Sequence, residues 1–168
     1  MILGKALGDI LEEFSISVNG TVLKVQYNYG KQDALDKFIA ECDRVKAKKF
    51  PLIFYVTNTV NDLETDLRCT TNIVIMTNTN NNWLSKKRTS ETFDKIIHPI
   101  YKKLIPMIES HKDFKIIGQF STRLTYDDIA NYGIVKGEIG QKKSSKSVAS
   151  DFIDARKINL TLEYFKNT

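Results

Sequence analysis

The stretch Phe50-Pro51-Leu52-Ile53-Phe54-Tyr55-Val56 decides the fold of this chain. Five apolar residues follow a proline that stands at the entrance of the run and not inside it. Such a run is typical of a strand that is covered on both faces. Residues 67–76 come next, and they place Leu67, Cys69, Ile73 and Ile75 at alternate positions. This alternation predicts a long second strand, and we expect it to lie beside the first.

Three helices are expected around this pair of strands, because apolar residues recur at helical spacing over about 2–14, 32–48 and 90–108. Thr89 or Ser90 is the expected N-cap of the third helix, which is the longest. Pro99 and Pro106 fall inside its pattern, and we expect kinks or a break of the helix near one of them. Further strand-like segments cover 21–29, 114–120, 134–139 and 158–164.

The order of these elements indicates the fold class. A helix, a strand, a second helix, two strands, the long helix and three closing strands do not alternate strictly, which excludes a doubly wound fold. We therefore expect an α+β fold with a single mixed or mainly antiparallel sheet and helices packed on it. The 168 residues are enough for one domain, which we expect to span residues 1–168.

Composition limits the class of protein further. A hydrophobic content of 42% and a charged content of 27% are ordinary for a globular domain. No stretch approaches the roughly 20 apolar residues that a membrane helix needs, and the first residues lack the pattern of a signal peptide. Cys42 and Cys69 do not form a C-x-x-C motif, so we expect buried thiols in a reducing cytoplasm. The net charge of +5 permits contact with nucleic acid but does not require it.

The sequence offers little catalytic chemistry. The nucleophile-elbow, phosphate-loop and H-E-x-x-H motifs are missing. His98 and His111 are thirteen positions apart, which is not the local spacing of a metal pair. Carboxylates gather at Asp62-Glu64-Asp66 and Asp127-Asp128, but acids in a polar loop are more often solvated than metal-bound. We predict a protein that is not an enzyme and that holds no metal or cofactor.

Two loops are the candidate contact surfaces. Dense asparagine after residue 77 favours turns over strand pairing, and a Lys/Ser-rich loop follows residue 140. Tryptophan and arginine are enriched among interface residues that dominate binding, although core packing is the alternative for the tryptophan. The candidate subunit or partner contacts are Asn80, Asn81, Asn82, Trp83, Arg88, Lys142, Lys143 and Lys146.

A resemblance to a known family adds to this interpretation. The motifs that carry it are Phe50-Pro51-Leu52-Ile53-Phe54-Tyr55-Val56, Asn72-Ile73-Val74-Ile75-Met76-Thr77, Trp83-Leu84-Ser85-Lys86-Lys87-Arg88, Phe93-Asp94-Lys95-Ile96-Ile97-His98-Pro99-Ile100-Tyr101 and Asp151-Phe152-Ile153-Asp154-Ala155-Arg156-Lys157-Ile158-Asn159-Leu160. Together they resemble small virion proteins of phages and prophages of Bacteroides-type bacteria, including crAss-like phages. Those proteins look like neck and tail-completion subunits with a tail-terminator-like fold.

The resemblance covers about residues 50–110 and 150–164 and implies a role in the virion. It implies a homo-oligomeric ring, six- or twelve-fold, that is assembled in the host cytoplasm and joins the portal or adaptor to the tail. Such a ring surrounds the DNA channel, where non-specific contact with DNA is possible. The asparagine run at 78–82 and the Lys/Ser-rich loop depart from the family.

Two alternatives stay open from the sequence. The first is a small cytosolic nucleic-acid-binding module, whose binding would depend strongly on salt because phosphate contacts release counterions. The second is a small hydrolase or nuclease that uses the loop from Asp62 to Asp66, whose turnover would require a metal and would be lost in Asp66→Asn.

Overall fold

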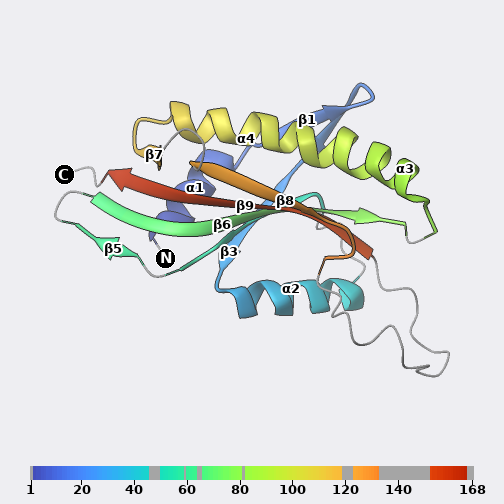
Figure 1. Ribbon diagram of the computed structural model, residues 1–168, viewed down its shortest axis with the longest axis horizontal. Helices are drawn as coiled ribbons and strands as arrows, with labels where there is room; N and C mark the ends of the chain where they lie inside the picture. Colours follow the sequence, from blue (N-terminus) through green and yellow to red (C-terminus); the bar gives the residue numbers. More distant parts are fainter. Residues whose placement is uncertain are drawn as a thin grey trace.

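The computed structural model describes residues 2–45, 50–58, 60–63, 66–80, 82–118, 123–132 and 152–165, and of residues 39–45 and 152 it describes the backbone only. Three helices are present in this part of the chain (Figure 1). The first two are α1 (Ile2–Leu11) and α2 (Gln32–Val45). The third is a continuous run of α3 (Ser85–Arg88), the π-helical η1 (Thr89–Ile97) and α4 (His98–Ser110).

Within the described residues, the sheet at the centre of the molecule has seven strands. Its main path runs β3 (Gln26–Gly30), β4 (Leu52–Val56), β6 (Asp66–Thr79), β9 (Phe152–Phe165) and β7 (Phe114–Ile117). The short β5 (Asn61–Asp62) pairs with β6, and β8 (Leu124–Ile129) pairs with β9. Only β3 and β4 pair in parallel, through α2 as the connection, and all other pairs of the sheet are antiparallel. The predicted α+β fold with a mixed, mostly antiparallel sheet is confirmed.

The two strands predicted first are neighbours at the middle of this sheet. β4 and β6 pair antiparallel from Leu52↔Met76 to Val56↔Asn72, and all five residues of β4 are buried, as the uninterrupted apolar run predicted. On its other edge, β6 pairs with β9 over fourteen residues. β9 is thus longer than the predicted strand 158–164, because its first half contains charged residues that hide the apolar pattern.

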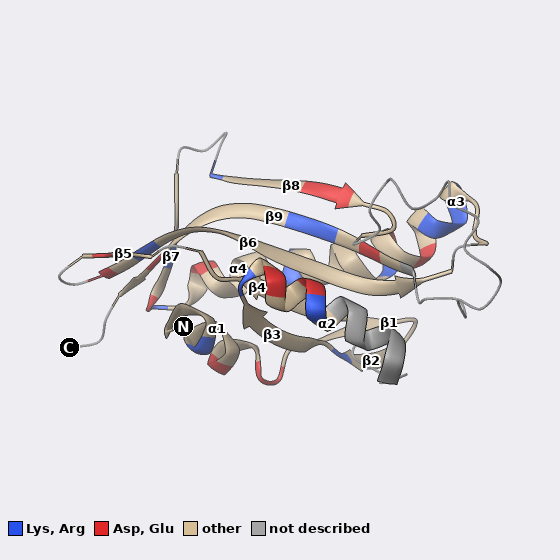
Figure 2. Ribbon diagram, turned by 90° about the horizontal axis from the view of Figure 1, so that it is seen from below, with Lys and Arg blue, Asp and Glu red and all other residues tan. Residues whose placement is uncertain are grey.

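Helices cover the two faces of the sheet unequally. The run from η1 through α4, together with α1, lies on one face, and α2 lies on the other (Figures 1 and 2). The larger core, under η1, α4 and α1, includes Ile73, Ile100 and Ile158. The smaller core, under α2, includes Leu35, Phe54 and Met76. This arrangement follows from β4 and β6, whose alternate residues supply both cores.

Two further details differ from the sequence-based expectations. The predicted strand 21–29 is two strands in different sheets, because the chain leaves the hairpin of β1 (Ser15–Val18) and β2 (Thr21–Lys24) at the buried Val25 and enters β3. The predicted N-cap at Thr89 or Ser90 is wrong, since the helical run begins at Ser85 and the Thr89 hydroxyl donates to the Ser85 carbonyl, 3.0 Å away, inside the helix.

The helical run continues past both prolines of the long helix. The π-helical η1 ends at Ile97, and His98 donates its backbone N–H to the Phe93 carbonyl five residues earlier. Pro99, which has no N–H, stands at the start of α4, and Pro106 lies inside α4. The predicted strand over 134–139 lies outside the described residues.

Candidate functional site

The candidate residues around the asparagine run lie at one end of the molecule, beside α3 (Figure 1). Asn80 and Asn82 are exposed, and the Asn82 N–H donates to the Asn80 side-chain oxygen at 2.9 Å, as in an asparagine-based turn. Trp83 is half-buried and belongs to neither core. The remaining candidates, Asn81, Lys142, Lys143 and Lys146, lie outside the described residues.

Leu84, Lys86 and Lys87 are among the exposed residues at this end, and we call these three the basic tip. The Leu84 side chain is 82% exposed, which is the largest value among the exposed large apolar residues of the described chain. Both lysines are exposed, and the Lys87 ammonium lies 5.1 Å from the centre of the Trp83 ring. The basic tip therefore presents one apolar side chain beside two cations.

Arg88, the candidate on α3, turns toward the protein interior. Its Nε lies 2.9 Å from Asp154 Oδ2, and the two side chains are 13% and 0% exposed. Asp154 also accepts hydrogen bonds from the Thr92 hydroxyl at 3.0 Å and from the Asn131 N–H at 3.2 Å. Arg88 is thus engaged within the chain, and its role as an interface contact remains a prediction.

A second buried arginine, Arg156, lies two positions after Asp154 and on the same face of β9. Its Nε and Nη2 donate to the two oxygens of Asp128, at 2.7 and 2.8 Å. Its guanidinium lies 4.2 Å from the centre of the Tyr126 ring and 5.1 Å from that of Tyr101. Burial acts to lower the pKa of Arg156, but the hydrogen bonds and charge of Asp128 outweigh burial and raise it.

His98 completes this network. Its Nδ1 lies 3.1 Å from Arg156 Nη1, and Nδ1 is the acceptor of this hydrogen bond because a guanidinium can only donate. The sequence analysis missed both arginine networks. The signal that could have found them is the spacing of Asp154 and Arg156, which places opposite charges on the apolar face of a strand, where each requires a partner.

The described carboxylates that were considered for catalysis lie on β8, on β5 and at the start of β6. Asp127 and Asp128 are adjacent on β8, so their side chains point to opposite faces, and Asp128 is bound to Arg156. Asp62 lies on β5 and Asp66 begins β6, while Glu64 lies outside the described residues. Within the described ranges, no group of three or more potential metal ligands is present.

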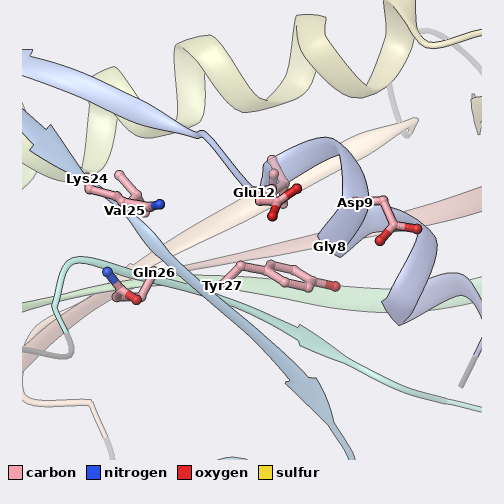
Figure 3. A pocket seen from close by; sticks show the side chains of 8 residues that line it. Gly8, Asp9, Glu12, Lys24, Val25, Gln26 and Tyr27 are labelled. Carbon is pink, nitrogen blue, oxygen red and sulfur yellow. The ribbon is translucent and has the colours of Figure 1, made fainter.

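An open pocket of about 400 Å³ lies at the other end of α1 from the N-terminus, between α1 and the strands β2 and β3 (Figure 3). The part of its wall at the end of α1 contains Gly8, Asp9 and Glu12, and the carboxylates of Asp9 and Glu12 are exposed. We call this pocket the acidic pocket. Tyr27 lies beneath α1 and donates its hydroxyl to the Gly4 carbonyl at 2.7 Å. Burial, with the nearby Tyr55 and Tyr29, raises the pKa of Tyr27.

The hairpin of β1 and β2 continues this surface. Asn19 and Gly20 form its turn with positive φ angles of 50° and 79°, the conformation of the tight hairpin turns that this pair of residues favours. Val22 is 73% exposed, and it lies on the same side of β2 as Lys24, which lines the acidic pocket and pairs with Glu13 at 3.7 Å. An exposed apolar side chain therefore adjoins the acidic pocket.

Comparisons with known proteins do not assign a family to this arrangement. No protein-family model matches the chain, and no curated protein matches it significantly. None of the helices in the described ranges is long and apolar enough to cross a membrane.

Proposed function

We propose that this protein is a structural, non-catalytic virion subunit with a tail-terminator-like fold, which forms a homo-oligomeric ring in the neck of a tailed phage. The ring, six- or twelve-fold, joins the portal or adaptor to the tail and surrounds the DNA channel. The proposal rests on the resemblance over residues 50–110 and 150–164. The α+β fold with a mostly antiparallel sheet is compatible with it.

The observation that supports the proposal best is the contrast between the interior and two exposed surfaces. The central strands β6 and β9 pair over fourteen residues, and two arginine networks, Arg88 with Asp154 and Arg156 with Asp128, tie helices and strands to β9. In contrast, highly exposed apolar side chains lie at Leu84, directly before α3, and at Val22 on the hairpin. A closed ring requires two different surfaces on each subunit, because its interfaces are heterologous.

The experiment that tests the proposal is the oligomeric state of the full chain. We expect light scattering and electron microscopy to show a large symmetric oligomer, either of the chain alone or on a complex of portal and neck proteins. A monomer under both conditions would overturn the proposal.

The same preparation separates the two alternatives. Salt-dependent binding of DNA by a monomer would favour the nucleic-acid-binding module. Metal-dependent hydrolysis that is lost in Asp66→Asn would favour the enzyme. On the sheet, the exposed Lys115 and the half-buried Lys157 stand opposite acids across the strands, at Glu163 and Asp127, so these two lysines do not form a basic nucleic-acid surface.

A further inference from the structure

We infer that the basic tip of one copy docks against the acidic pocket of the next copy, so that Leu84, Lys86 and Lys87 face Asp9, Glu12 and Val22 of a second chain. This inference rests on the proposed ring and names the contact between its subunits. The partner is a second copy of this chain, bound head to tail.

The two surfaces match in charge and in apolar content. The basic tip has Lys86 and Lys87 exposed, and its only described ring contact is that of Lys87 with Trp83. The acidic pocket has Asp9 and Glu12 exposed, and among the described residues neither carboxylate forms an ion pair. These are opposite charges available for a partner.

Each surface also contains a highly exposed apolar side chain. Leu84 at 82% and Val22 at 73% have the two largest exposed fractions among the large hydrophobic residues of the described chain. Bringing the two side chains together removes apolar surface from water, which favours association. The charges then fix which surface meets which, since basic tips repel each other and so do acidic pockets.

The basic tip and the carboxylates at the end of α1 lie apart on one molecule, although the hairpin with Val22 runs from α1 toward the α3 end (Figure 1). Lys86 and Lys87 therefore cannot meet Asp9 and Glu12 within a single chain. α3 lies at one end of the long axis in Figure 1, with α1 well toward the other end, and Figure 2 also separates them. A contact between two different surfaces of identical chains is heterologous, and it closes into a ring when the rotation between copies permits.

Charge reversal tests the inference with two variants and their mixture. Lys86→Glu/Lys87→Glu makes the tip acidic, and Asp9→Lys/Glu12→Lys makes the pocket basic. Each variant alone should assemble at least about tenfold more weakly than the unmodified chain, because both surfaces then have the same sign. Mixed in equal amounts, the variants should form oligomers in which they alternate, as an even-numbered ring allows.

The variant with all four substitutions reverses both surfaces and should assemble by itself. Lys102→Glu/Lys115→Glu, at exposed positions of α4 and β7, changes the net charge as the tip variant does and should leave assembly unchanged. Circular dichroism and thermal unfolding establish that each variant is folded, and analytical ultracentrifugation measures assembly.

The outcomes separate this inference from the proposed function. A monomeric unmodified chain, even with neck proteins, would overturn the ring and this contact together. A ring that forms equally well in both double variants would overturn this contact and leave the ring standing. Weakened assembly that neither the mixture nor the fourfold variant restores would also overturn the pairing of tip and pocket.

Discussion

Replacement of Arg88 by methionine should destabilise the folded subunit strongly. In the structure, Arg88 Nε lies 2.9 Å from Asp154 Oδ2, and the Asp154 side chain has no exposure to solvent. At an effective dielectric constant near 20, two unit charges at this distance attract by about 6 kcal/mol. The cost of removing both ions from water offsets much of this attraction, so the pair itself contributes little net stability.

The single substitution differs from removal of the pair, because it leaves the Asp154 carboxylate buried without its cation. Thr92 and Asn131 still donate to Asp154, but neither supplies a charge. We expect Arg88→Met to lower the free energy of unfolding by about 3–5 kcal/mol, the usual cost of breaking a buried pair. The melting temperature should fall by on the order of 10 °C.

The double variant and a control on the same helical run make this test specific. Arg88→Met/Asp154→Leu removes both charges and should recover most of the lost stability. Lys95→Met breaks the Lys95–Glu91 pair, whose side chains are 36% and 34% exposed, and it should cost no more than about 0.5 kcal/mol. Urea unfolding at neutral pH measures all three, and a loss in Arg88→Met no larger than in Lys95→Met would refute the reasoning.

Two further perturbations act at the contact between α1 and β3. Burial raises the pKa of Tyr27, so the folded protein holds the phenol neutral, and the contribution of Tyr27 to stability should be constant below pH about 10 and fall above it. Tyr27→Phe should weaken this alkaline loss of stability, measured by urea unfolding from pH about 8 to about 11. At neutral pH the same substitution should cost about 1 kcal/mol, because it removes the hydrogen bond to Gly4. An unchanged alkaline profile in Tyr27→Phe would contradict this. Gly4→Ala would place a Cβ 2.6 Å from the Tyr29 ring carbon Cγ, whereas Gly8→Ala would place one 3.1 Å from Tyr27 Cε1. We expect a loss of about 1–3 kcal/mol in thermal unfolding for Gly4→Ala and a smaller one for Gly8→Ala, and equal losses would show that the crowding is not the cause.

Patterns of local periodicity were sufficient for the middle of the fold. The apolar run at Leu52–Val56 and the alternation from Leu67 predicted two neighbouring strands, and both are central strands of the sheet. Periodicity works here because the core excludes water from β4 on both faces, so each of its positions had to be apolar. For the same reason, the spacing of Ile97, Ile100, Leu104 and Ile108 predicted the buried face of the long helix.

Polar residues were harder to interpret, because their burial depends on partners far away in the sequence. Asp154 is buried since Arg88, 66 positions earlier, supplies the opposite charge, and the same holds for Arg156 and Asp128. The sequence analysis named Arg88 as a candidate contact with a partner, whereas in the folded chain its side chain turns toward β9. No local pattern distinguishes an arginine that faces solvent from one that will meet a carboxylate on another strand.

The sequence by itself determined the fold class, the two central strands and the position of the three helices, because these follow from the local alternation of apolar and polar residues. Only the tertiary structure decided which charges are buried in pairs and which surfaces remain exposed. The basic tip comes from residues 84–87 and the acidic pocket from residues 8–27, and nothing near either segment in the sequence relates them. Their relation depends on three-dimensional placement, which positions α1 and α3 far apart on one subunit.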